Sequence, residues 1–250
     1  MLVDFHSHIL PGIDDGATDV ETSLKMLRML REQGVERVAL TPHFYAHRMS
    51  VEDFLSKRER AFQQLLEAMG DEPFPELMLG AEIAMEYDLE NVADLQALRL
   101  EGTPFLMIEL SIRGFSPWML DKAISICYAN GSQPMIAHLD RYIGIYRDDQ
   151  VERIAGDTDC VLQLNVTSLL KTRKRKKVLS WIQDSEKTVV FGSDAHNTLM
   201  RAPQFDKPMK WLSKKLGREQ MESIKIKSQR ISEGEIPPFS DEWINRKGVL

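Results

Sequence analysis

Seven short apolar runs alternate along the chain with longer segments that have helical spacing. The runs are MLVDF, VERVALT, ELMLGAE, PFLMIEL, QPMIAHL, CVLQLNV and TVVFGSD. Each run is too short and too rich in β-forming residues for a helix, so each one predicts a buried strand. Strands that alternate with helices form right-handed βα units around a parallel sheet. The pattern therefore predicts an α/β fold.

The segments between the runs predict the helices and the closure of the sheet. Expected helices cover residues 18–34, with Thr18 and Glu21 as a capping box, and residues 51–69, 116–131, 168–183 and 203–216. No G-x-G-x-x-G follows the first run, which disfavours a dinucleotide-binding sheet. A chain of 250 residues suits one barrel. We predict a single (β/α) barrel domain over residues 1–216 and an extension over residues 217–250 that packs on the barrel or is partly loose.

Composition narrows the functional classes. The formal net charge of −6 argues against a general nucleic-acid binder. No apolar stretch approaches the roughly 18 residues of a membrane span, and Asp4, His6 and His8 interrupt the first apolar run, so we expect no signal peptide. Cys127 and Cys160 lie in apolar surroundings and lack metal-type spacing, as expected for core residues in a reducing compartment. We therefore expect a cytoplasmic protein.

Polar side chains that can bind metals stand where the predicted strands end. They are His6, His8, His43, Glu82, Glu109, His138, Asp194 and His196. A parallel barrel places all its strand carboxyl ends on one face, so these residues should meet at one mouth. Period-two geometry directs His6 and His8 to the same side of their strand.

A cluster of this kind requires cations. Asp15, Glu82, Glu109 and Asp194 would bring four negative charges into one pocket, where they would repel one another or become protonated. A single histidine at a strand end has an ordinary alternative as a hydrogen-bonded residue, and the DDG sequence around Asp15 is also typical of a turn. The complete set favours bound metal ions. Imidazole and carboxylate ligands without thiolate suit manganese, iron or zinc.

The motifs DFHSHILPGIDDG, TPH, GAEI, IE, IAHLDRY and GSDAHN resemble those of the PHP (polymerase and histidinol phosphatase) superfamily. The similarity extends over about residues 1–205 and is closest to the bacterial manganese-dependent protein tyrosine phosphatases of capsule and exopolysaccharide synthesis. It implies a distorted (β/α)7 TIM-like barrel with three divalent ions, manganese favoured. Carried over residue by residue, it assigns His6, His8, Glu82 and Asp194 to the first ion, Glu82, Glu109 and His138 to the second, and Asp15, His43 and His196 to the third.

The resemblance also suggests catalytic residues. Arg141 and Arg201 match family arginines near the phosphate, although each has an ordinary alternative as a structural ion pair. Family members often carry a second histidine directly after TPH; here that position is Phe44, and the next histidine is His47. His47 and Asp140 are the candidates for the proton donor. The chain lacks a Cys-x5-Arg signature, which excludes a cysteine phosphoenzyme.

The function implied by the resemblance is hydrolysis of phosphotyrosine on a protein, with the tail of a bacterial tyrosine kinase as the expected partner. A histidinol-phosphatase-type enzyme, another PHP phosphoesterase and a non-catalytic metal-stabilised kinase regulator remain alternatives. A metalloamidohydrolase would require lysine where Glu109 stands. The basic run over residues 171–177 is read as a solvated helix face in preference to a surface that attracts acidic tails. Asn165 could support a metal ligand or cap a loop. The sequence leaves the oligomeric state open.

Overall fold

The computed structural model describes residues 1–86, 88–157 and 159–236, so residues 237–250 of the predicted extension lie outside the described residues. The strands of this part are β1 Val3–Asp4, β2 Arg37–Leu40, β3 His43–Phe44, β4 Glu76–Leu79, β5 Glu82–Ala84, β6 Phe105–Glu109, β7 Gln133–Ile136, β8 Val161–Asn165 and β9 Thr188–Gly192. Every predicted run contains a strand. Two breaks raise the count: Pro42 separates β2 from β3, because proline has no N–H to donate, and Gly80 separates β4 from β5.

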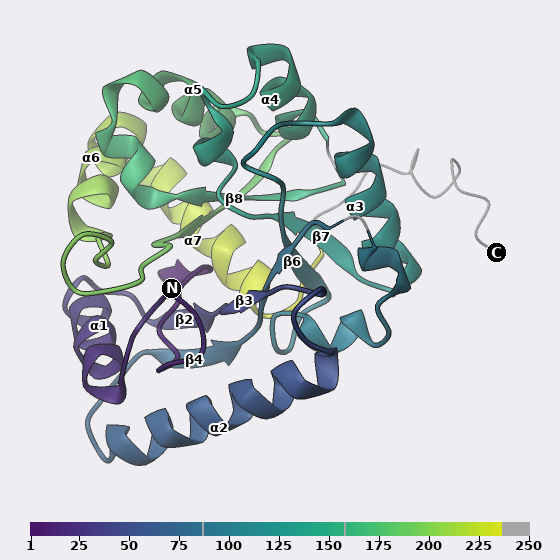
Figure 1. Ribbon diagram of the computed structural model, residues 1–250. Coiled ribbons are helices and arrows are strands. Elements are labelled where there is room, and N and C mark those ends of the chain that lie inside the picture. Colours follow the sequence, from purple (N-terminus) through teal and green to yellow (C-terminus); the bar gives the residue numbers. More distant parts are fainter. Residues whose placement is uncertain (87, 158, 237–250) are drawn as a thin grey trace.

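Helices surround the strands (Figure 1). They are α1 Val20–Glu32, α2 Val51–Met69, α3 Pro117–Ala129, α4 Asp148–Ala155, α5 Thr172–Gln183, α6 Asp206–Leu216 and α7 Arg218–Ser232, and short 3-10 turns include η3 Leu139–Tyr142 and η4 Val166–Leu170. All five predicted helices are present, whereas α4 and α7 were not predicted. The capping box was wrong: Asp19 is the N-cap of α1, and its side chain accepts a hydrogen bond from the Thr22 N–H at 2.8 Å.

All the strand pairs are parallel, in the orders β1-β2-β4 and β3-β5-β6-β7-β8-β9. These two sheets confirm the α/β class. Backbone hydrogen bonds also connect the last strand region to the first: Phe5 N–H donates to the Phe191 carbonyl at 2.9 Å, and Asp194 N–H donates to the His6 carbonyl at 2.8 Å. The parallel direction brings the carboxyl ends of β1 and β9 together, so that residues 6–8 lie beside residues 194–196.

Apolar side chains from several strands form an inner cluster of buried residues. This inner cluster includes Phe5, Phe105, Met107 and Met135, all fully buried. Ile231 of α7 belongs to the same cluster, so this helix, which the sequence did not predict, packs against the inner cluster. No helix of the described residues is both long and apolar enough to cross a membrane. The division between barrel and extension at residue 216 stays a prediction.

Candidate metal centre

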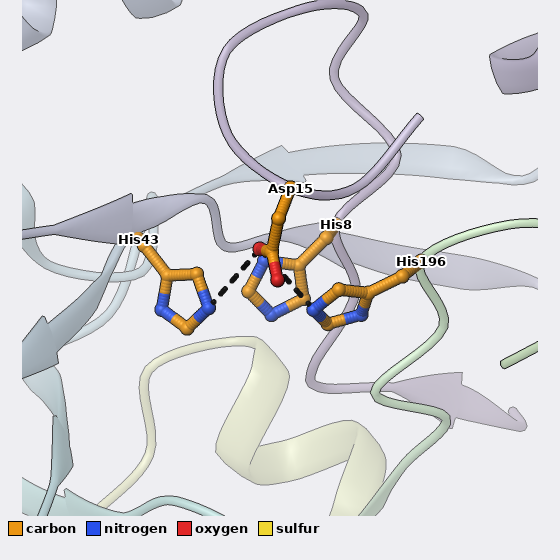
Figure 2. A group of neighbouring side chains, drawn as sticks. All are labelled: His8, Asp15, His43 and His196. Atoms are coloured by element: carbon orange, nitrogen blue, oxygen red, sulfur yellow. Dashed lines mark ion pairs between the residues drawn. The ribbon is translucent and has the colours of Figure 1, made fainter. Parts of the chain in front are cut away.

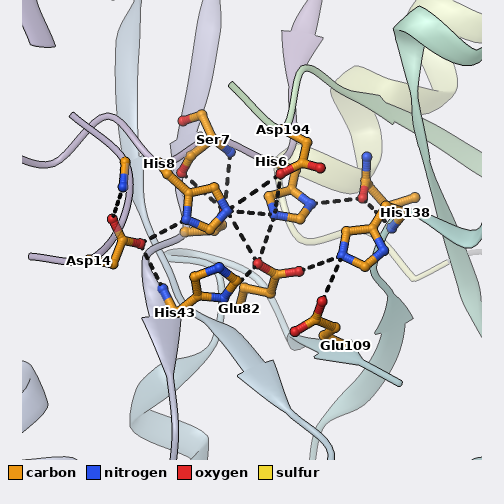
Figure 3. A network of polar contacts seen from close by, with 12 residues as sticks. His6, Ser7, His8, Asp14, His43, Glu82, Glu109, His138 and Asp194 are labelled. Carbon is orange, nitrogen blue, oxygen red and sulfur yellow. Dashed lines mark hydrogen bonds and ion pairs between the residues drawn. The ribbon is translucent and has the colours of Figure 1, made fainter. Parts of the chain in front are cut away.

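Glu82 lies at the centre of the predicted ligand set, among histidines from other strand ends (Figure 3). Its Oε2 atom lies 3.2 Å from Nε2 of His6, 3.2 Å from Nε2 of His8 and 3.0 Å from Nδ1 of His43. Strands β3 and β5 pair with His43 opposite Glu82, which holds these two side chains next to each other. The Glu82 side chain is only 1% exposed. Its carboxylate charge is therefore buried among nitrogen atoms.

The second oxygen of Glu82 faces the ends of β6 and β7. Its Oε1 atom lies 2.8 Å from Nε2 of His138, and the same nitrogen lies 3.3 Å from Oε1 of Glu109. Phe105 and Met107 of β6 point into the inner cluster, and Glu109 follows them with the same period of two. The carboxylate of Glu109 therefore leaves the strand on the interior side and reaches the mouth.

Asp194 and His196 follow β9 and reach the same mouth. The Oδ1 atom of Asp194 lies 3.9 Å from Nε2 of His6 and 3.7 Å from Nε2 of His8. Asp194 has a backbone φ of 52° and His138 has a φ of 33°. These are left-handed values, which residues other than glycine rarely adopt. Two predicted ligands thus hold strained backbone conformations directly after their strands.

The arginines predicted at the phosphate site both contact Asp194. Nη2 of Arg201 donates to Oδ1 of Asp194 at 2.7 Å, and Nη1 of Arg141 lies 3.5 Å from Oδ2. A turn brings Arg201 back to the site, because its N–H donates to the side chain of Asn197 and its carbonyl accepts from the N–H of His196. The two guanidinium groups therefore lie at the rim of the metal-type cluster formed by the nine predicted ligands, and each is about one-third exposed.

Asp15 reaches the cluster from the loop after β1 (Figure 2). Its Oδ1 atom lies 3.4 Å from Nε2 of His43 and 3.5 Å from Nε2 of His196, and its side chain is 67% exposed. His8, Asp15, His43 and His196 each offer one ligand atom within 4.8 Å of the others. The structure thus brings together the three residues implied for a third ion and adds His8.

Two further groups have the same ligand-type spacing. They are His6, His8 and Asp194, and His43, Glu82 and Glu109. The first group lies within the set implied for the first ion, whereas the second contains His43 in place of His138. All nine predicted ligands therefore meet in one connected network, in which His8 and His43 each belong to two groups.

The hydrogen bonds of the two histidines after β1 fix where their protons lie. The Gln163 Oε1 atom accepts the backbone N–H of His138 at 2.6 Å, so it also accepts from Nδ1 of His6 at 2.9 Å. Nδ1 of His8 donates to the Asp14 carboxylate at 2.7 Å. When each ring carries one proton, both Nε2 atoms present lone pairs, and they lie 3.1 Å apart. Two lone pairs and a carboxylate oxygen at this distance repel one another unless a cation lies between them, so the residues present fit a divalent ion.

Without that cation the site holds protons. Burial alone would lower the pKa of His8, but the hydrogen bonds with Asp14 and Glu82 outweigh burial and raise it to about 10. Burial likewise opposes protonation of His138, while Glu109 and Glu82 raise its pKa to about 9. His196 behaves differently, because burial and the neighbouring His8 lower its pKa to about 3. Proton and metal would therefore compete for His8 and His138.

Two residues that orient these histidines, Asp14 and Gln163, were missed in the sequence analysis. Asp14 accepts from Nδ1 of His8 and also from the backbone N–H of His43 at 3.0 Å. The available signals were the first aspartate of DDG and a lone glutamine inside an apolar strand. Gly16 permits this loop to close, since a Cβ there would lie 2.1 Å from the His8 carbonyl oxygen.

Asn165 supports the centre from β8, as one of its two expected roles requires. Its side-chain N–H donates to Oδ2 of Asp194 at 2.9 Å, and its backbone N–H donates to the buried Asp140 carboxylate at 2.7 Å. Burial raises the pKa of Asp140 to about 6. Another predicted site residue, His47, is exposed and pairs with Glu86 outside this network. Its role as proton donor stays a prediction.

The chain is similar in sequence to a known protein family and to several bacterial proteins. The family model described as "Capsular polysaccharide synthesis, CpsB/CapC" matches residues 2–231. The chain is 26% identical over 247 residues to tyrosine-protein phosphatase CpsB of Streptococcus agalactiae serotype V, an alignment that covers 91% of this chain and 96% of the relative. It is 28% identical over 222 residues to tyrosine-protein phosphatase YwqE of Bacillus subtilis, covering 87% of this chain and 86% of the relative.

Solved structures share the fold. One belongs to the crystal structures of YwqE from Bacillus subtilis and CpsB from Streptococcus pneumoniae, described as metal-dependent tyrosine phosphatases. It matches with a TM-score of 0.77 at 22% identity, over 94% of this chain and 96% of that one. Histidinol phosphate phosphatase from Lactococcus lactis, solved with zinc, L-histidinol and phosphate, matches with a TM-score of 0.50 at 13% identity, over 94% of both chains.

Proposed function

The chain belongs to the CpsB/CapC family of capsular polysaccharide synthesis, and we propose that it is a metal-dependent phosphatase that hydrolyses phosphotyrosine on proteins. The main support is the facing pair of Nε2 lone pairs on His6 and His8 beside the buried Glu82 carboxylate. The curated relatives of Streptococcus agalactiae and Bacillus subtilis are named tyrosine-protein phosphatases and align over most of this chain. The names of these relatives support phosphotyrosine as the substrate, and the residues of the site support metal-dependent hydrolysis.

We further propose three ions held by the nine predicted ligands. His6, His8, Glu82 and Asp194 would hold one, Glu82 and Glu109 with His138 or His43 a second, and Asp15, His43 and His196 with His8 a third. Manganese suits this set, because imidazole and carboxylate ligands are present without thiolate. Bound ions would polarise the phosphoryl oxygens and activate water for attack at neutral pH.

The protein's own residues would position the phosphoryl group. Arg141 and Arg201 flank Asp194 at the rim, where their guanidinium forks can bind phosphate oxygens in pairs. Asp194 would share its carboxylate charge between a bound ion and the arginines, which would leave guanidinium N–H groups of Arg141 and Arg201 available to the substrate. Asn165 hydrogen-bonds the Asp194 carboxylate and Gln163 hydrogen-bonds the His6 imidazole, and these contacts would keep both groups oriented toward the ions.

A closed (β/α)7 barrel is the architecture we propose for this arrangement. The hydrogen bonds from Phe5 to Phe191 and from Asp194 to His6 support it, because they join the first and last strand regions. Such closure would give every strand end the same mouth. A tyrosine kinase that controls capsular or exopolysaccharide synthesis is the proposed protein substrate, and the cytoplasm is the proposed location.

One assay tests the proposal. Metal-free protein should be inactive on a phosphotyrosine peptide, and added manganese should restore turnover. Under the same conditions a phosphoserine peptide and histidinol phosphate should be poorer substrates. Full activity without metal would overturn the metal requirement. A preference for histidinol phosphate would instead identify a small-molecule phosphatase.

A further inference from the structure

A cleft of about 530 Å³ opens beside the metal-type cluster. Its lining includes the buried Asp194, the partly exposed Arg141 and Arg201, and the exposed Lys171, Leu170 and Met200. Since Asp194 and both arginines also border the cluster, a substrate whose phosphate lies between the arginines would extend into this cleft.

The exposed charge of the cleft is positive. Its two carboxylates, on Asp140 and Asp194, are 2% and 6% exposed and are already bound to Asn165 or arginine. Arg141 and Arg201 are about one-third exposed, and Lys171 is exposed. Within the described part of the chain, Lys171 forms no ion pair with an acidic side chain. The cleft therefore presents its cations to a ligand and keeps its anions inside.

The backbone around Lys171 is held in place by the basic run that follows it. Nζ of Lys174 donates to the Asp140 carbonyl at 2.7 Å, and the Arg175 guanidinium donates to the Leu169 carbonyl at 2.7 Å and to the Leu170 carbonyl at 3.1 Å. These cations bind backbone oxygens of the segments that line the cleft. Part of the run thus fixes the wall, while Lys171 remains available at its edge.

We infer that this cleft is a subsite for the peptide around the phosphotyrosine, in which Lys171 selects an acidic residue close to the phosphorylated position. The inference rests on the proposed function. The apolar rim of Leu170 and Met200, which are 37% and 90% exposed, would contact the tyrosyl ring or a neighbouring side chain. Lys171 would then form an ion pair with a glutamate or aspartate of the substrate, at the point where the peptide leaves the cleft.

Three phosphotyrosine peptides that differ only in their flanking residues test this inference on the manganese-loaded protein. The flanks are glutamate, glutamine or lysine, and the measured quantity is the ratio of kcat/KM for the glutamate peptide over the glutamine peptide. We expect a ratio of about three to five for the unmodified chain, as for one exposed ion pair, and the lysine peptide should be the poorest. Raising the salt from about 0.1 M to about 1 M should reduce this ratio, because the Debye length falls from about 10 Å to about 3 Å.

Variants of one helix region give the control. Lys171→Ala should bring the ratio to about one and Lys171→Glu should invert it, as expected when a single exposed ion pair is lost or reversed. Lys176→Glu makes the same charge change on an exposed residue of α5 that does not line the cleft, and it should keep the ratio. Equal hydrolysis of all three peptides, or equal ratios in the two glutamate variants, would overturn the inference and leave the proposed function intact. No hydrolysis of any phosphotyrosine peptide, with manganese bound, would overturn both.

Discussion

The carboxylate of Asp14 lies 2.7 Å from Nδ1 of His8 and fixes which nitrogen of that ring faces the cluster. The same carboxylate accepts the backbone N–H of His43. One side chain thus orients one predicted ligand and holds the backbone of a second. Asp14 does not itself belong to any of the three ligand groups.

Replacement of Asp14 by asparagine should weaken manganese binding about 10- to 100-fold, as for other residues that orient a metal-binding histidine. Asparagine keeps the shape but loses the charge that makes His8 a better ligand. Metal titration of the purified variant measures the effect. Asp71→Asn, on an exposed aspartate after α2, is the control. Equal affinities in both variants would assign Asp14 to the loop alone.

Metal binding should release protons and strengthen as the pH rises. The metal-free site raises the pKa of His8 to about 10 and that of His138 to about 9, so at pH 7.5 both rings carry a second proton and are positively charged. Manganese must displace these protons, and we expect about two per chain. A pH dye in weakly buffered protein measures the release. Asp14→Asn should release fewer protons, because His8 loses its anionic partner; no release between pH 7 and pH 8 would contradict the assignment.

Asp15→Ala should lower the bound metal by about one ion per chain, because Asp15 joins only the group with His43 and His196. The side chain is 67% exposed, so its removal should leave the fold intact. Simultaneous replacement of His6 and His8 should cost more metal, since His8 belongs to two groups. Elemental analysis with circular dichroism checks both variants. A full metal complement in Asp15→Ala would make the DDG stretch a turn only.

Arg201→Lys should raise the inhibition constant of inorganic phosphate about tenfold while the bound metal stays constant. Lysine keeps the positive charge but loses the planar fork that binds two oxygens, and charge-assisted hydrogen bonds contribute about 1.5–3 kcal/mol each. Arg153→Lys, in a surface pair with Asp121, is the matched control and should leave inhibition unchanged. Identical inhibition in both variants would return Arg201 to a structural role with Asp194.

Gly192→Ala should destabilise the protein by about 1–3 kcal/mol through overpacking. A Cβ at this position would lie 2.6 Å from the His6 Cβ and 2.6 Å from Nε2 of Gln163. The same shift should weaken metal binding, because it displaces His6. Gly34→Ala, at a positive-φ position with open space, should destabilise the fold without changing metal affinity. Thermal unfolding and metal titration separate these outcomes, and unimpaired metal binding in Gly192→Ala would show that β9 can yield.

The strands, and the meeting of polar side chains at their carboxyl ends, could be predicted from the sequence because both depend on local order. An apolar run followed by His, Glu or Asp carries its own signal, and parallel pairing brings six such strand ends together. Helix α7 carried a weaker signal, since its burial depends on a few residues such as Met221 and Ile231 that contact distant parts of the fold. Helix α4 was missed for a different reason, because its eight residues are too few for a clear periodic pattern.

The supporting contacts of the site could not be predicted in the same way. Asp14 and Asp15 are adjacent and chemically identical, and only the closure of the loop at Gly16 decides which one turns toward Nδ1 of His8. The exchange of His43 and His138 between ligand groups is likewise a matter of side-chain direction at the mouth. These choices are made by tertiary packing and leave no trace in spacing.

The left-handed backbone at His138 and Asp194 lowers the stability of the fold while it positions two predicted ligands. Each such residue costs of the order of 1–3 kcal/mol. A glycine at position 194 would relieve this backbone strain and remove a predicted ligand at the same time. Selection for thermostability alone would therefore erode the mouth first, and any laboratory evolution of a hardier variant has to screen for turnover at every round.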